Sequence, residues 1–229
     1  LAEGKLAEPD TWEVALSGGA NKREAFERLL RKGKLGYMAL LRNLRNMQQA
    51  EVDSALVFSA LAEGAAKSKA LPFRYVAAAR AVPMWEAQID AAMQTAMGGL
   101  DKLPGRTCVL VDVSGSMAEQ LSAKSDLKRI DAAAALAVLV RGIAEEARVF
   151  KFNDSAKEVP ARQGMALIDA IGRAGGGTMV GAAVNTVSRL LGKLDVRRHF
   201  SAGSDCGLSG CTVGEHDDAG ALRQGYRSD

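Results

Sequence analysis

The first hundred residues carry apolar side chains at intervals of three and four, which is the spacing of one face of an α-helix. Residues with this spacing include Phe26, Leu29, Leu30, Leu35, Met38, Leu41, Leu44 and Met47. Glycine and proline interrupt the pattern at Gly33, Gly64, Pro72, Pro83, Gly98 and Gly99. This pattern predicts a succession of amphipathic helices from about residue 11 to residue 99, each burying its apolar face against its neighbours. We expect Trp12 and Trp85 to anchor that core.

The pattern changes after residue 100 to an alternation of strands and helices. We predict strands at 108–113 and 148–152, and helices at 127–146, 164–173 and 180–191, with Asp126 capping the long helix. Helices that follow strands in this order predict a doubly wound, Rossmann-like α/β layer with a parallel sheet. The expected organisation is therefore a helical domain at 1–103, an α/β domain at 104–195 and an irregular tail at 196–229.

Three oxygen-bearing side chains, Asp112, Ser114 and Ser116, follow the first predicted strand at intervals of two. Ligands of open α/β sheets bind beyond the carboxyl ends of the strands, which is where this segment lies. One carboxylate with neutral hydroxyls suits Mg²⁺, which prefers oxygen ligands. Thr178, after Gly175-Gly-Gly177, is positioned to add a further hydroxyl.

Simpler interpretations remain open for both segments. Asp112 can simply end a buried strand while Ser116 and Glu119 form a capping box at a helix start. The glycines before Thr178 are also typical of a helix stop followed by a threonine cap.

Composition narrows the class of protein without naming a function. The chain has 229 residues, of which 48% are hydrophobic and 25% charged, as in ordinary globular proteins. The apolar run at 132–140 is too short to cross a bilayer, so we expect no membrane partner. Both histidines, His199 and His216, lie in the tail and no nucleophile–base pair is present, so we expect no enzymatic activity.

The cysteines and charges add two expectations. Three cysteines give no even disulfide framework, which favours a reducing, cytoplasmic location, and the irregular spacing of Cys206 and Cys211 from the histidines disfavours a zinc site. The net charge is only +3, but residues 21–45 hold eight basic side chains against Glu24 and Glu27. The eight are Lys22, Arg23, Arg28, Arg31, Lys32, Lys34, Arg42 and Arg45. Such a run is often just a solvated helix face.

Several motifs, in order, resemble proteins of the TROVE-domain (Ro ribonucleoprotein) family. They are Thr11-Trp-Glu, Gly36-Tyr-Met-Ala-Leu-Leu-Arg-Asn-Leu-Arg-Asn46, Leu71-Pro-Phe-Arg74 and Pro104-Gly-Arg-Thr-Cys-Val-Leu-Val-Asp-Val-Ser-Gly-Ser116. The last also resembles the metal-ion-dependent adhesion site of von Willebrand factor A domains. The resemblance covers about residues 11–194. It implies a partial HEAT-like helical repeat array followed by a von Willebrand factor A domain that holds a divalent cation.

The same resemblance implies an RNA-binding scaffold for noncoding RNA quality control. Its expected partners are small Y-type RNA and single-stranded RNA ends, with an exoribonuclease as a further partner in bacteria, and no DNA. Arg42 and Arg45, three apart on one predicted helix, are the first candidates for phosphate contacts, ahead of the other six basic residues. Asn43 and Asn46 either bind RNA through their amides or tie adjacent helices together.

Both ends of the chain depart from the family pattern. The chain starts at Leu1, and we expect further helices before it in a longer protein. A strand ending in the last metal-binding aspartate is expected after residue 194, where Asp205 is the nearest candidate. The loss of apolar periodicity there suggests a shifted reading frame from about Val196. Two other functions remain open: a metal-dependent protein-interaction module without direct RNA binding, and a subunit of a chelatase-type ATPase complex.

Overall fold

The computed structural model describes residues 21–123, 125–191 and 200–202. Its contacts divide the chain into a helical unit, Leu1–Leu100, and a sheet unit, Asp101–Asp229. The sequence had predicted the change of pattern at residue 103. Trp12, the segment before residue 21 and most of the expected tail, including its proposed frame shift, lie outside the described residues.

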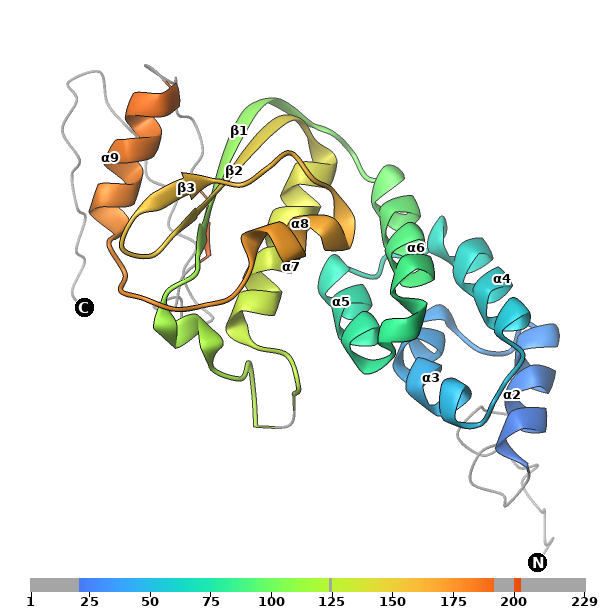
Figure 1. Cartoon of the computed structure of the whole chain (residues 1–229). Coiled ribbons are helices and arrows are strands. Elements are labelled where there is room, and N and C mark those ends of the chain that lie inside the picture. Colours follow the sequence, from blue (N-terminus) through green and yellow to red (C-terminus); the bar gives the residue numbers. More distant parts are fainter. Residues whose placement is uncertain (1–20, 124, 192–199, 203–229) are drawn as a thin grey trace, which may run out of the picture. The chain divides into compact units, whose positions relative to one another are not determined.

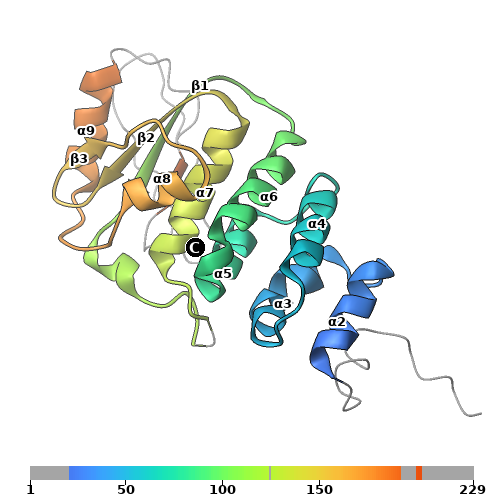
Figure 2. The ribbon, with the colours of Figure 1, turned by 45° about the vertical axis from the view of Figure 1, so that its right-hand side comes forward.

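The helical unit is a run of short helices, as the periodicity predicted (Figure 1). From residue 21 onward they are α2 (Lys22–Arg31), α3 (Tyr37–Gln49), α4 (Ser54–Ala65), α5 (Pro72–Ala81) and α6 (Glu86–Gly98), with the 3₁₀ turn η1 (Pro83–Trp85) directly before α6. Helices two apart in the sequence pack together, α2 on α4, α3 on α5 and α4 on α6, as Figure 2 shows. This side-by-side stacking is the arrangement through which amphipathic helices bury their apolar faces. A HEAT-like repeat remains a prediction.

Apolar residues that set the helical period form the core of this unit. Fully buried side chains include Phe26, Leu44, Met47, Val57, Tyr75, Ile89 and Met93. Trp85 is buried and meets Phe58 edge to face, with ring centroids 5.6 Å apart and planes at 86°. The expectation that Trp85 anchors the core is therefore confirmed.

Two helices of this unit end in the same hydrogen-bonded motif with different residues in the left-handed position. After α2 that position is Gly33, with φ +60°, and the amide of Lys34 donates to the carbonyl of Leu29 at 3.0 Å. After α3 it is Glu51, with φ +53°, and the Val52 amide likewise donates to Met47. This is the Schellman motif, in which glycine is preferred because a Cβ atom is strained there.

Gly64 does not break a helix, contrary to the sequence expectation. It lies in the last turn of α4, and a Cβ atom there would stand 2.3 Å from Cδ2 of Tyr37. The Tyr37 hydroxyl donates to the carbonyl of Leu61, 3.2 Å away, which holds the ring against α4. Glycine is needed at this helix crossing for close approach.

Within its described residues, the sheet unit has four strands in the order β3-β2-β1-β4. They are β1 (Leu103–Asp112), β2 (Ala144–Phe152), β3 (Ala156–Glu158) and β4 (Phe200–Ala202). β1 pairs in parallel with β2 and with β4, but β3 is antiparallel to β2, so the sheet is mixed rather than wholly parallel. The short β4 falls in a segment expected to be irregular. The sequence did not predict β4 because three residues are too few to show the two-residue alternation of a strand, and only the folded structure reveals its pairing with β1.

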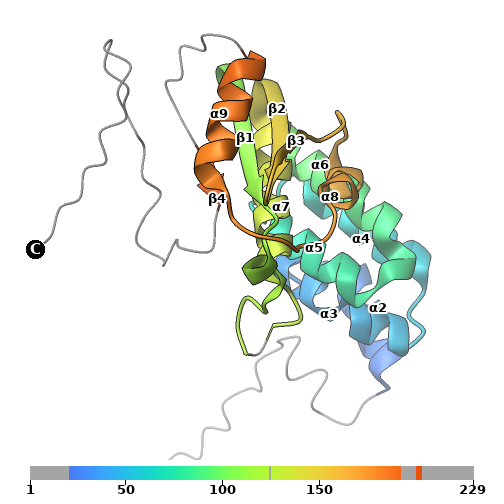
Figure 3. The ribbon, with the colours of Figure 1, turned by 60° about the vertical axis from the view of Figure 1, so that its left-hand side comes forward.

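Helices cover both faces of this sheet, as Figure 3 shows: α9 (Val180–Leu191) on one face and α7 (Arg129–Ile143) with α8 (Gly164–Ile171) on the other. Leu110, Phe150 and Phe152 pack with Ala183 and Val187 of α9 in one core cluster. The alternate strand residues face α7, which packs on β1 and β2. This two-sided covering explains the continuous apolar run at residues 108–111 of β1, the central strand.

The predicted boundaries of the long helix were wrong at both ends. α7 begins at Arg129 rather than 127, and Asp131, not Asp126, provides the cap, because its carboxylate accepts the amide of Lys128 at 2.9 Å. It ends at Ile143, since β2 starts at Ala144 and extends alongside β1. Strand pairing thus overrides the helical propensity of the alanine- and glutamate-rich segment. None of the helices in the described segments is both long and apolar enough to span a membrane.

Candidate functional site

The three oxygen-bearing residues predicted to bind a metal come together at the end of β1. Asp112 is the last strand residue, opposite Phe152 of β2, and its side chain is only 1% exposed. One carboxylate oxygen, Oδ1, accepts the backbone N–H of Ser114 at 2.7 Å. The hydroxyl oxygens of Ser114 and Ser116 lie 3.3 Å apart. We call these three residues the oxygen cluster.

The capping interpretation of Ser116 was wrong. Ser116 lies inside a single 3₁₀ turn, η2 (Gly115–Ala118), whose cap position is occupied by Ser114 without a side-chain cap bond. The carboxylate of Glu119 pairs with Arg129 at 2.9 Å instead of reaching back to the serine. The serine hydroxyls therefore have no capping role that would explain their spacing.

A second loop, residues 175–179, lies directly against the oxygen cluster, and we call it the glycine loop. The amide of Gly175 donates to the carbonyl of Val113 at 2.7 Å, and the amide of Gly115 donates to the carbonyl of Gly176 at 3.0 Å. Two backbone bonds thus join the segment that carries Thr178 to the segment that carries the serines. Thr178 itself is exposed, and within the described part of the chain its hydroxyl makes no hydrogen bond. It precedes α9 by two residues, so it is not the helix cap.

Sequence reasoning missed two residues of this site, Asn153 and Asp154, which follow β2. The Asn153 side-chain amide donates to the carbonyl of Gly175 at 2.8 Å, and Asp154 accepts the amide of Gly177 at 3.0 Å. The carbonyl of Asn153 also accepts the amide of Met179 at 2.8 Å. An Asn-Asp pair directly after a buried strand was the available signal, because polar residues at the carboxyl end of a strand mark the ligand-binding edge.

The donor set of the oxygen cluster fits a small hard cation. Two ligands at neighbouring octahedral positions of Mg²⁺ are about 3 Å apart, given metal–oxygen bonds of about 2.0–2.1 Å. The 3.3 Å between the two serine oxygens is close to that spacing. In the described residues there is no group of three or more His, Cys, Asp or Glu side chains placed to hold a metal. Any cation here would therefore rely on hydroxyl and water oxygens besides the carboxylate, as Mg²⁺ commonly does.

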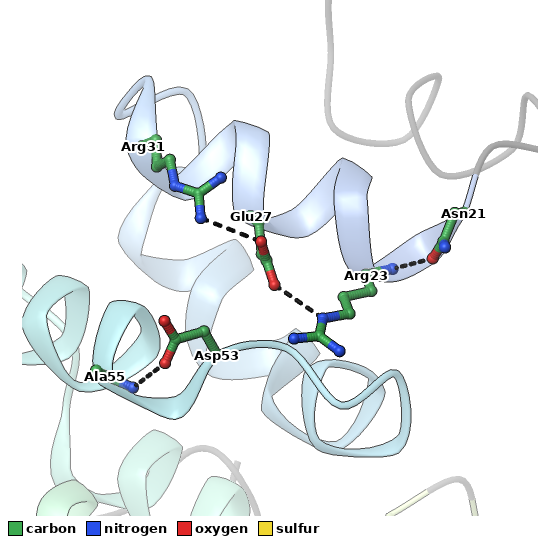
Figure 4. Close-up of polar contacts among 6 residues, drawn as sticks. All are labelled: Asn21, Arg23, Glu27, Arg31, Asp53 and Ala55. Carbon is green, nitrogen blue, oxygen red and sulfur yellow. Dashed lines mark hydrogen bonds and ion pairs between the residues drawn. The ribbon is translucent and has the colours of Figure 1, made fainter.

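All eight basic residues between 21 and 45 are exposed, but they are not equivalent. Glu27 of α2 bridges two of them: its carboxylate lies 3.0 Å from Arg23 Nε and 3.2 Å from Arg31 (Figure 4). The hydrogen bond from Arg23 is the main cause that lowers the pKa of the Glu27 carboxyl, so this group stays charged at neutral pH. Two of the predicted phosphate-binding side chains are thus already paired.

Arg42 and Arg45 lie exposed on α3, as the prediction required, but their asparagine neighbours do not act as expected. Asn43 is buried, and its amide donates to the carbonyl of Ala39, one turn earlier, at 2.9 Å. Asn46 donates to the Asn43 side chain at 2.9 Å. Because both bonds stay within α3, the asparagines stabilise one helix rather than tie two together, and Asn43 is not available to RNA.

The remaining residues that the sequence analysis considered as metal ligands lie outside the described segments. They are Asp205 and the disfavoured zinc set of Cys206, Cys211, His199 and His216. Cys108 is described: it is a free, half-buried thiol in β1, and burial raises its pKa to about 11.

Comparison with known proteins adds a family to this geometry. Over 90 residues the chain is 37% identical to telomerase protein component 1 of Mus musculus, and 36% identical to that of Rattus norvegicus. Each alignment covers 37% of this chain, but the chain spans only 3% of the length of either relative. The crystal structure of the Deinococcus radiodurans Ro (RSR) protein aligns with a TM-score of 0.49 and 21% identity, covering 68% of this chain and 36% of that one.

A family model matches over a longer stretch. The TROVE domain model aligns with residues 3–158, which is more than half of the chain and includes both α2–α6 and the oxygen cluster. The match therefore continues from the helical unit into the sheet unit without stopping at the boundary between them. On this match, the chain belongs to the TROVE domain family.

Proposed function

We propose that this chain is the RNA-binding component of a ribonucleoprotein and has no enzymatic activity of its own. The observation that carries the proposal is the TROVE match across the exposed basic helices α2 and α3. The partners we propose are single-stranded RNA ends and small noncoding RNA of the Y type, with an exoribonuclease as a further protein partner. The cytoplasm is the compartment we propose, in keeping with the free thiol of Cys108.

The physical basis of RNA binding would be phosphate neutralisation. Lysine and arginine side chains that contact phosphates release condensed counterions, so affinity falls steeply with salt and depends little on base sequence. Arg42 and Arg45 are three residues apart on α3, which puts them on one side of the helix and within reach of one RNA strand. Leu41 and Leu44, which precede the two arginines in the sequence, are buried and hold α3 in the core, while Arg42 and Arg45 remain exposed.

A charge reversal on α3 tests this assignment. The double variant Arg42→Glu/Arg45→Glu should lower the affinity for a labelled single-stranded RNA at least tenfold and flatten its dependence on salt. The double variant Lys67→Glu/Lys69→Glu changes the net charge equally at exposed positions that follow α4, so it is the matched control. Equal losses in both variants would show that only net charge matters and would refute the role of α3.

For the sheet unit we propose a von Willebrand factor A-type domain that binds Mg²⁺ through Asp112, Ser114, Ser116 and Thr178. Three observations support this: a sheet whose parallel strands end at the oxygen cluster, the short spacing of the serine oxygens, and the glycine loop held beside them. A bound Mg²⁺ would supply positive charge and an open coordination position for an acidic ligand. Isothermal titration with MgCl₂ tests the site, and Ser116→Ala should weaken binding without removing a buried charge.

The alternative function, a metal-dependent protein-interaction module without direct RNA binding, makes opposite predictions. Its support is the same oxygen cluster, with the basic helices as scaffold only. If charge reversal at Arg42 and Arg45 leaves RNA affinity unchanged while Asp112→Ala abolishes capture of a protein partner, the module interpretation is correct. Because Asp112 is buried, Ser116→Ala should be measured beside it to separate loss of metal from loss of folding.

A further inference from the structure

We propose that Asn153 and Asp154 are positioning residues: they hold the glycine loop against the oxygen cluster so that Thr178 is presented to the bound cation. This inference rests on the Mg²⁺ site proposed above. We call the two residues the polar turn, because they connect β2 to β3. The contacts of the polar turn with the glycine loop, and the space between them, carry the argument.

The glycine loop is fixed from two sides. On one side, backbone bonds join Gly175 to Val113 and Gly176 to Gly115. On the other side, three bonds of 2.8–3.0 Å join the polar turn to the loop, two of them through the side chains of Asn153 and Asp154. The loop therefore bridges the ends of β1 and β2.

The space between the polar turn and the loop explains two of the three consecutive glycines. A Cβ atom on Gly176 would lie 2.6 Å from an Asp154 carboxylate oxygen and 2.8 Å from the Asn153 amide, and one on Gly177 would lie 2.6 Å from the other carboxylate oxygen. Gly176 also has φ +84°. Gly175, in contrast, has nothing within 4 Å of its Cβ position. The glycines at 176 and 177 are thus required by close contact with the polar turn.

Thr178 is the residue that this arrangement leaves available. Every other residue of the glycine loop uses a backbone group in one of the bonds described above, whereas Thr178 makes none within the described residues. Its neighbours Gly177 and Met179 are both bonded to the polar turn, so its position is constrained while its hydroxyl stays open to a ligand. Residues that orient metal ligands typically affect metal affinity by about 10–100-fold.

The contact geometry favours positioning over direct coordination by Asp154. Both of its carboxylate oxygens lie close to Gly176 and Gly177, and one of them accepts the Gly177 amide. The oxygen cluster is bonded to the same loop through Gly115 and Val113 of the β1 side. Gly176 thus lies against Asp154 and is bonded to Gly115, so in the proposed arrangement the carboxylate acts on the cation through the loop.

The experiment uses the 229-residue chain and two measurements. Titration calorimetry with MgCl₂ gives the cation affinity, and hydrogen exchange of the amides at 175–179 in cation-free protein gives the order of the loop. Asp154→Ala should speed exchange in the loop and weaken Mg²⁺ binding at least tenfold. Asp154→Asn keeps an oxygen that accepts the Gly177 amide, so it should restore both values to within about threefold of the original chain.

A glycine pair serves as the steric control. Gly177→Ala should reproduce the Asp154→Ala defect, whereas Gly175→Ala, which meets open space, should leave exchange and cation affinity unchanged. A double-mutant cycle with Thr178→Val completes the set: in the Asp154→Ala background the threonine substitution should cost little more, because both changes remove the same contact.

Three results would overturn the proposal, and they can be told apart. If Asp154→Ala speeds loop exchange but leaves Mg²⁺ affinity within twofold, the polar turn is structural only. If Asp154→Asn loses as much affinity as Asp154→Ala, the carboxylate acts by its charge and not by positioning. If the unchanged chain shows no heat with MgCl₂, the cation site itself is refuted, and the positioning role with it, whatever the exchange data show.

Discussion

Glu27 is the side chain whose replacement should increase RNA affinity. It bridges Arg23 and Arg31 on α2 at 3.0 and 3.2 Å, and the pKa of its carboxyl is lowered, so it neutralises part of the basic surface at every pH above the acid range. A phosphate that binds either arginine must compete with this carboxylate. In Glu27→Gln the competing charge is absent, and both guanidinium groups become available to RNA.

The size of the effect follows from counterion release. For single strands the slope of log affinity against log salt changes by about 0.7 for each phosphate contact, so two freed arginines steepen it by up to about 1.4. If affinities converge near 1 M salt, this corresponds to a gain of up to roughly 25-fold at about 0.1 M. One freed arginine would give roughly fivefold on the same reasoning.

Fluorescence anisotropy of a labelled single-stranded RNA at several KCl concentrations measures both the affinity and the slope. Glu24→Gln is the matched control, because Glu24 is exposed in the first turn of the same helix and has the same charge. It should change the slope far less than Glu27→Gln. An unchanged slope in Glu27→Gln, or equal gains in both variants, would refute the idea that paired arginines limit binding. Circular dichroism confirms that α2 remains folded in each variant.

Three further outcomes follow from the fold. Gly64→Ala should lower the free energy of unfolding by about 1–3 kcal/mol because the new Cβ meets Tyr37. Gly98→Ala, which has open space in α6, should raise the same free energy by up to about 1 kcal/mol. Urea unfolding measures both changes, and stabilisation by Gly64→Ala would contradict the packing. Glu51→Gly should raise the same free energy by about 1 kcal/mol by relieving left-handed strain, and Glu51→Ala, which keeps the Cβ, should not. Cys108, with a pKa of about 11, should react with iodoacetamide slowly at pH 8 and faster as the pH rises toward 11, measured by peptide-resolved mass spectrometry; fast labelling at pH 7 would contradict its burial.

Patterns confined to a few neighbouring residues were predicted well from the sequence. The apolar spacing that ends at Met47 located α3 because each apolar residue has its partner one turn away in the same helix. The oxygen cluster also depends on neighbouring residues only: Asp112, Ser114 and Ser116 are two apart in the sequence and lie together at the end of β1. The Glu27 bridge was also predictable in principle, because Arg23 and Arg31 each lie four residues from Glu27 on the same helix. The count of charged residues alone does not reveal it.

Features that depend on distant contacts were not predictable. Gly64 looked like a helix break because only the folded structure brings Tyr37, 27 residues earlier, onto its surface. The hydrogen-bonded residues of the polar turn and the glycine loop are 22 or more positions apart in the sequence, and these bonds give neither segment any periodicity. Glu51 was missed for another reason: its left-handed backbone is imposed by the end of α3 and not by its own preference.

The shortness of β3 has a consequence for how this protein behaves at high concentration. β3 is the outer neighbour of β2, spans only Ala156–Glu158, and presents Lys157 and Glu158 to solvent. Glu158 is held to Arg148 of β2 by two bonds of 2.7 Å, which tie β3 to β2. Short, charged outer strands discourage a neighbouring molecule from adding its own strand. Deleting β3 would uncover the edge of β2 at residues 150–152, and self-association through that edge would follow.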